Sequence, residues 1–113
     1  MINNVTTALE QFEEAAKGHG ESVEISDYKA GNKYYKKIAS AITYLKDQNQ
    51  IEQLMKFIDH ESIGVRLWTA AYLLPVQSER AVEVLNKIKS GNSIHSFTAE
   101  TTLNEWEKGR LAL

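Results

Sequence analysis

The sequence predicts an all-α fold: a short right-handed stack of three antiparallel helical hairpins, in one domain over residues 1–113. Three observations lead to this prediction. Apolar residues recur at helical spacing in six stretches, and no segment reads as a strand. The pattern also repeats along the chain, as it does in stacked supersecondary units. One stretch, VRLWTAAYLL at 65–74, is apolar nearly all round and therefore needs neighbours on several sides.

The first predicted helix follows the apolar stripe Val5, Ala8, Leu9, Phe12 and Ala16. We expect it to end before Gly18, because glycine is common just past a helix C-terminus, and we expect 18–22 to form a loop. Ser26 is a suitable N-cap for the second helix. Gly31 costs about 1 kcal/mol relative to alanine inside a helix, so Asn32 is an alternative start for that helix.

The third and fourth helices form the second hairpin. Asn49 and Glu52 have the spacing of a capping box at the start of the third helix. Residues 59–62 form the turn, and the fourth helix, 65–74, ends at Pro75. We expect this fourth helix to lie at the centre of the molecule.

The third hairpin holds the fifth and sixth helices. Ser78 is the expected N-cap of the fifth helix, and 90–92 the stretch that ends it. The sixth helix ends at Lys108 and Gly109, a cation followed by the usual C-terminal glycine. Trp68 and Trp106 fall on apolar stripes, which predicts that both are core residues.

The repeat is visible when the second helices of the three hairpins are superimposed. Three triplets of residues then share equivalent positions: Tyr35, Val65 and Phe97; Ala41, Ala71 and Leu103; Tyr44, Leu74 and Trp106. About three such units are needed to bury a common core. The chain has the length for that number.

The stretch LMKFIDHESIGVRLWTAAYLL, with Asp59 in its turn, resembles a HEAT unit. From about Tyr28 onward the chain is similar to a bacterial family of small HEAT-like proteins of unknown function. The segments that carry the resemblance are NKYYKKI at 32–38, VRLWTAAYLL at 65–74 and TLNEWEKGRL at 102–111. The resemblance implies a HEAT-like α–α superhelix and no activity. Some relatives are similar to immunity proteins encoded beside bacterial toxins.

Composition excludes several function classes. The formal net charge of −2 argues against a general polyanion binder, and the chain has no cysteine for disulfides or thiolate chemistry. The N-terminus lacks the features of a secretory signal, and no apolar run could span a membrane. We expect a cytoplasmic protein that does not bind membranes.

Charge is unevenly distributed along the first half of the chain. Residues 1–27 carry a net charge of −5 and residues 28–46 carry +5. The predicted binding residues Lys33, Tyr34, Lys36 and Lys37 belong to this basic stretch, with Lys29. They have three interpretations: neutralisation of the acidic stripe Glu10, Glu13 and Glu14, an acidic protein partner, or a nucleic-acid backbone.

Arg66 is the remaining candidate binding residue. In a HEAT-like unit its guanidinium would reach a turn acid, Asp59 or Asp47, and join neighbouring layers. The functional alternative is recognition of an anionic group on the concave face.

No catalytic, cofactor or metal pattern stands out. His19, His60 and His95 are far apart in the sequence, and none lies at ligand spacing from another. We therefore expect no enzyme, no cofactor and no metal. The favoured function is protein–protein interaction through the concave face of helices two, four and six, with an acidic toxin as the most concrete partner. The alternatives are a nucleic-acid-binding helical repeat and a self-assembling structural protein; a monomer or a homodimer fits the sequence.

Overall fold

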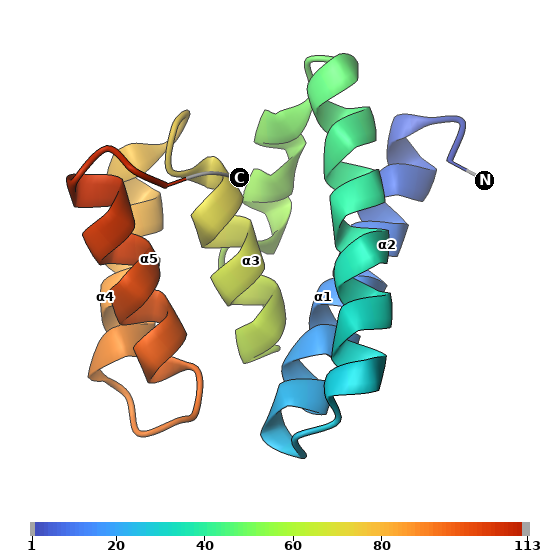
Figure 1. Ribbon diagram of the computed structural model, residues 1–113. Coiled ribbons are helices and arrows are strands. Elements are labelled where there is room, and N and C mark those ends of the chain that lie inside the picture. The colour runs from blue at the N-terminus through green and yellow to red at the C-terminus, as the bar shows by residue number, and fades with distance from the viewer. Residues whose placement is uncertain (1, 112–113) are drawn as a thin grey trace.

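The computed structural model describes residues 2–111 and is all-α, as predicted (Figure 1). Its elements are α1 (Val5–Glu24), α2 (Tyr28–Asp47), the 3₁₀ helix η1 (Ile51–Phe57), α3 (Ile63–Leu73), α4 (Ser78–Ser90) and α5 (Ser96–Glu107). No strand occurs within these residues. In the same part of the chain, none of the helices has the length and apolar character required to cross a bilayer.

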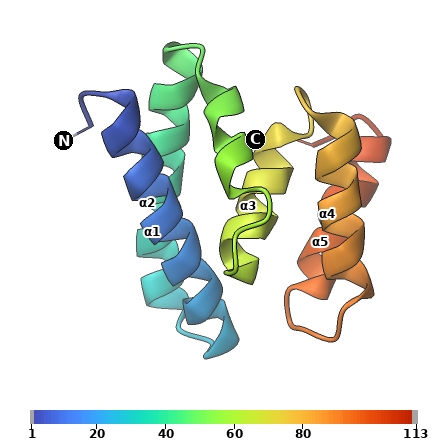
Figure 2. The same cartoon turned by 180° about the vertical axis from the view of Figure 1, so that it is seen from behind.

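Successive elements pack as pairs: α1 with α2, η1 with α3, and α4 with α5. Helix α3 also packs against α1 and α4, so it lies at the centre, as its apolar sequence predicts. Helices α2 and α5 are nearest to the viewer in Figure 1. In Figure 2, which shows the opposite side, α1 and α4 are nearest. The molecule therefore presents a face formed by α2, α3 and α5.

One continuous core joins the pairs. Its largest fully enclosed side chains are Phe12, Ile38, Leu45, Leu54, Val65, Leu73, Leu74 and Leu85. They come from all elements except α5, which adds the buried Ala99 and Leu103 to the same cluster. The core thus lies between the two layers of helices, and α3 contributes to it along most of its length.

Helix α1 does not end before Gly18. It continues through the predicted loop to Glu24, because the two glycines serve close packing instead of a turn. A Cβ atom on Gly18 would lie 2.6 Å from the ring of Tyr34, and one on Gly20 would lie 2.9 Å from Gly64 Cα. Both glycines are therefore required by neighbouring helices.

Helix α2 begins at Tyr28, so neither Ser26 as a cap nor Asn32 as a start is correct. The cap is Asp27, whose side chain accepts a hydrogen bond of 3.1 Å from the Ala30 amide. Ser26 has a φ of 58°, in the left-handed region. The carboxylate at position 27 accounts for the start, because a capping side chain must accept from an amide two or three residues on.

Two further predicted caps are wrong. Asn49 has a φ of 57° and lies before the actual cap position of η1, Gln50, so the capping box with Glu52 does not form. Ser78 is the first residue of α4, and its hydroxyl donates to the carbonyl of Leu74. The predicted C-terminal ends of the last two helices agree with the structure. Helix α4 ends at Ser90, and Gly109 follows α5 with a φ of 69°.

Candidate functional site

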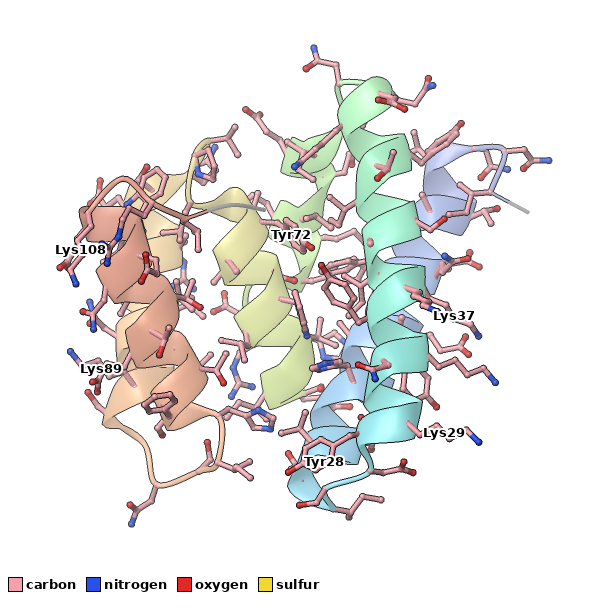
Figure 3. All side chains as sticks on the ribbon, in the orientation of Figure 1. Tyr28, Lys29, Lys37, Tyr72, Lys89 and Lys108 are labelled. Atoms are coloured by element: carbon pink, nitrogen blue, oxygen red, sulfur yellow. The ribbon has the colours of Figure 1, made fainter. Side chains whose placement is uncertain are left out.

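The lysines of the predicted binding residues lie on the outer edge of α2. Lys29 and Lys37 point away from α3 in Figure 3, and Lys33 and Lys36 are also exposed. Lys37 lines a shallow cleft of about 240 Å³ with Glu10 and Glu14 of α1. Among the described residues, no ion pair within 4.0 Å joins these lysines to α1. The acidic and basic stripes therefore lie side by side without direct pairing.

Tyr34 has a structural role in this arrangement. Its ring occupies the space that a Cβ on Gly18 would need, and it packs against the core. Above it, Gln11 Nε2 of α1 donates a 2.9 Å hydrogen bond to the Lys37 carbonyl. Tyr34 and the backbone of Lys37 therefore belong to the contact between α1 and α2.

Arg66 does not bind either predicted acid. Its Nη1 donates to the carbonyl oxygens of His60, at 2.7 Å, and Glu61, at 3.1 Å, which holds the turn before α3. Asp59 pairs instead with Arg80 of α4, and this hydrogen bond raises the pKa of Arg80. Arg80 therefore joins the neighbouring layers, the role predicted for Arg66.

The structure does not bring Arg66 and the lysines together. Arg66 lines a cleft with residues of α4, such as Val84 and Lys87, whereas Lys37 lines one with residues of α1. The two halves of the predicted binding site thus belong to different surfaces.

A third cleft has the character of a ligand site. It has a volume of about 190 Å³ and is lined mainly by apolar atoms. Its lining residues are His19, Gly20 and Val23 of α1, Gly64, Leu67, Trp68 and Ala71 of α3, and His95, Thr98 and Thr102 of the α5 segment. An apolar concavity with a few converging polar groups is the usual form of a binding site.

The cleft forms because α1 and α3 touch while α5 packs on α4. The backbones of Gly20 and Gly64 are in contact: a Cβ on Gly64 would lie 2.7 Å from the Ala16 carbonyl oxygen and 3.0 Å from Gly20 Cα. Helix α5 has its main contact with α4, on the far side of α3 from α1. Side chains of α1, α3 and α5 therefore converge around an opening between them.

His19 projects from α1 onto the aromatic wall of this cleft. Its ring meets Trp68 edge-on, with ring centroids 5.2 Å apart, and its Nδ1 accepts a 3.3 Å hydrogen bond from the indole N–H. Burial, reinforced by the imidazole of His95, lowers the pKa of His19 from its ordinary value of 6.5. In the neutral ring, Nδ1 accepts, so the proton is on Nε2.

His95 is 3% exposed and precedes α5. Its Nε2 lies 2.9 Å from Glu24 Oε2, which ties the turn before α5 to the end of α1. An ionised carboxylate only accepts hydrogen bonds, so Nε2 carries the proton. Within the described part of the chain, Nδ1 of His95 and Nε2 of His19 have no partner.

His60 forms a second tie to α1, outside the cleft. Its Nε2 lies 2.7 Å from Glu13 Oε2, and its Nδ1 accepts a 2.9 Å hydrogen bond from the Ser62 amide. Both ring nitrogens are therefore used, and the ring serves to hold the turn before α3 against α1.

Trp68 links the cleft to the rest of the face. Its ring lies 5.9 Å from Tyr35 and is stacked on Tyr72, also at 5.9 Å. Tyr72 lies between α3 and α2 (Figure 3), and burial, with a smaller effect of Tyr35, raises its pKa to about 12. Trp68 and Trp106 pack against the core but are only partly buried, so the prediction that they are core residues is correct in part.

Exposed apolar side chains lie close in sequence to Val23 and His95, two of the residues that line the cleft. Ile25, in the turn between α1 and α2, and Tyr28, the first residue of α2, are 75% and 73% exposed. Ile94 and Phe97, at the start of α5, are 54% and 74% exposed. The hydrogen bond between Glu24 and His95 joins the two turns, and both lie at the same end of the molecule in Figure 1.

The sequence does contain a signal for this cleft, but only if the first helix continues through Gly18. Read as one helix through Gly18, positions 12, 16, 19, 20 and 23 form a single stripe of helical spacing, which places His19 beside Val23. No comparable signal identifies His95, because a distant carboxylate and a distant helix place it. Among residues 2–111, no group of three or more histidine or carboxylate side chains could hold a metal ion.

No family model, curated protein or solved structure matches this chain. Its chemistry is therefore argued from the geometry of the described residues.

Proposed function

We propose that this protein is a non-enzymatic protein-binding module that uses the face formed by α2, α3 and α5. The carrying observation is the set of exposed apolar side chains in and beside the two turns that Glu24 and His95 join, Ile25, Tyr28, Ile94 and Phe97. Isolated exposed apolar residues are ordinary, but a cluster of large ones beside a concavity is typical of interaction surfaces. Tyr35, half-exposed against Trp68, extends the same apolar surface along α2.

The helical pairs support a right-handed HEAT-like stack as the architectural part of this proposal. In such a stack the second helix of each pair lines the binding face, which corresponds here to α2, α3 and α5. An immunity or antitoxin-like role is its most concrete biological form, and it rests on the resemblance of the segments 32–38, 65–74 and 102–111. The lysine edge of α2 would then lie at the rim, where charges affect association rate more than affinity.

The test is capture of a partner with matched variants. The tagged protein is immobilised and exposed to a lysate of its source organism, in parallel with the double variant Ile94→Ser, Phe97→Ser. Val76→Ser is the control, because Val76 is also a large exposed apolar residue but lies in the turn between α3 and α4, at the opposite end (Figure 1). Circular dichroism establishes that all three are folded.

We expect the wild type and Val76→Ser to retain the same protein and the double variant to lose it. Capture by all three alike, or by none, contradicts the proposal. A gene for that protein beside the gene for this chain supports the immunity role, whereas a nucleic acid retained in its place contradicts a protein-binding function.

A further inference from the structure

The cleft between α1, α3 and α5 offers an unusual pair of polar groups. His19 Nε2 carries a proton and has no acceptor, because His19 Nδ1 is occupied by the Trp68 indole N–H. In the neutral ring, His95 Nδ1 is an acceptor without a donor, because the single proton is on Nε2 and is directed to Glu24. Both rings line the same cleft. One imidazole donor and one imidazole acceptor are thus available to whatever occupies it, beside the hydroxyls of Thr98 and Thr102.

Both free nitrogens are accessible. Among residues 2–111, Thr69 Oγ1 is the only enclosed side-chain nitrogen or oxygen that lacks a hydrogen-bond partner. His95 is nevertheless almost wholly buried, so the open space beside its Nδ1 is the cleft. Polar groups that converge in an apolar concavity fix the orientation of a ligand and select its chemistry.

The size of the cleft limits the occupant. A cavity of roughly 150 Å³ accommodates a benzene-sized ring, and this cleft measures about 190 Å³. It therefore has room for one six-membered ring with a small substituent. The lining atoms of Val23, Leu67 and Ala71, with the ring of Trp68, match an apolar, aromatic occupant.

Hydrogen-bond capacity then selects among ring-bearing groups. A hydroxyl both accepts and donates, so it complements a site that offers one free donor, His19 Nε2–H, and one free acceptor, His95 Nδ1. A phenyl ring leaves both nitrogens unpaired, an indole only donates, and a carboxylate only accepts. A phenol is therefore the group that meets the volume, the apolar lining and the two nitrogens.

We infer that the cleft binds a phenol, and that its natural source is a tyrosine side chain of the protein partner. The inference rests on the protein-binding function proposed above. Tyrosine is among the residues that most often carry binding energy at protein interfaces. The exposed apolar side chains of Ile25, Tyr28, Ile94 and Phe97, which are close in sequence to the lining residues Val23, His95 and Thr98, would contact the partner around this residue.

The first experiment measures binding of p-cresol, the side-chain analogue of tyrosine, against toluene, which lacks the hydroxyl. Nuclear magnetic resonance of the Trp68 indole N–H reports on the cleft directly, because this group contacts His19. We expect p-cresol to bind at least tenfold more tightly than toluene, as expected for hydrogen bonds gained in an apolar site. Equal affinity, or no shift with either compound, overturns the inference.

Two histidine variants separate the hydrogen bonds from the fold. His19→Asn keeps an acceptor for the Trp68 N–H but removes the Nε2 donor. His95→Gln keeps a donor for Glu24 but removes the Nδ1 acceptor. Each is expected to weaken p-cresol binding roughly tenfold and to leave toluene binding unchanged. Equal losses for both compounds would show that the cleft has collapsed and would contradict the assigned roles.

A final pair of variants connects the phenol to the partner. Thr102→Phe fills the cleft from the partly exposed Thr102, and Thr101→Phe places the same side chain on its exposed neighbour outside the cleft. We expect Thr102→Phe, but not Thr101→Phe, to abolish p-cresol binding and to weaken capture of the partner at least tenfold. Capture that depends on Ile94 and Phe97 but tolerates Thr102→Phe overturns this inference and leaves the proposed function standing. Absence of any captured partner contradicts the function instead.

Discussion

Two glutamates of helix α1 each accept a hydrogen bond from a histidine, and the two histidines differ in what the second ring nitrogen does. Glu13 binds His60, whose other nitrogen accepts from the Ser62 amide. Glu24, about three helical turns further on, binds His95, whose other nitrogen is free beside the cleft. The same pair of residue types is thus closed at the middle of α1 and open at its C-terminal end. Chemistry available to a ligand depends on this second contact, which the residue types alone do not reveal.

The surroundings of the two glutamate–histidine contacts differ as well: one is closed and the other is open. Near Glu13 the core is closed: Phe12 is fully buried, and its ring lies 6.0 Å from Phe57 and 6.4 Å from Tyr72. Near Glu24 the helices enclose a cleft instead, and Trp68 is only partly covered. The first region stabilises the fold, and the second is the region available for binding.

The largest expected loss of stability tests whether the region around Phe12 is more tightly packed than the region around Trp68. Phe12→Ala should lower the free energy of unfolding by about 3–5 kcal/mol, because it leaves a cavity among closely packed rings. Trp68→Ala should cost less, about 2 kcal/mol, because part of its ring already faces open space. Urea denaturation of both variants measures the difference. A larger loss for Trp68→Ala would reverse the assignment of the two regions.

The same substitution in each histidine compares how much the two glutamate–histidine contacts contribute to stability. His60→Gln keeps a donor for Glu13 but leaves the Ser62 amide without its acceptor, which should cost about 1 kcal/mol. His95→Gln keeps the donor for Glu24 and removes a nitrogen that has no protein partner, so the loss should stay within about 0.5 kcal/mol. Equal losses in chemical denaturation would mean that His95 Nδ1 has a structural role.

The stability of the region around the cleft should also depend on pH, through His19. The pKa of His19 is lowered in the folded protein by burial, so between that pKa and 6.5 the unfolded chain binds more protons. Stability should therefore fall as pH decreases through 6.5 and level off below the folded pKa. The difference in denaturation midpoint between wild type and His19→Asn should change within that window and stay constant above it. Parallel curves would contradict the assigned neutral state of His19.

The smallest changes in stability are expected for the exposed lysines of α2, which take part in neither glutamate–histidine contact. Lys33→Glu with Lys36→Glu should change the free energy of unfolding by no more than about 0.5 kcal/mol. Lys37→Glu should cost slightly more, up to about 1 kcal/mol, because it adds a carboxylate to the cleft that holds Glu10 and Glu14. Thermal denaturation at low and high salt checks this order, and a loss that salt does not reduce would contradict an electrostatic origin.

Sequence periodicity predicts the helical fold because it reports on burial. The apolar stretch 65–74 indicates a central helix, and α3 is central. Positions fixed by a single distant neighbour are less predictable. Gly18 and Gly20 resemble a loop in sequence, yet each faces another helix at close range. The carboxylate of Asp59 selects Arg80 over Arg66 because of where α4 packs, which no local pattern contains. His95 becomes a cleft residue for the same reason.

The contact between Gly20 and Gly64 has a consequence for how this protein can diverge. A methyl group at either position would meet backbone atoms of the opposite helix, at 2.9 Å or 2.7 Å, so α1 and α3 would have to separate. Residues of both helices line the cleft, among them Val23 and Leu67, so the separation would change its width. Positions 20 and 64 should therefore be inherited together, and a lineage that gains a side chain at either one should also change the shape of this cleft.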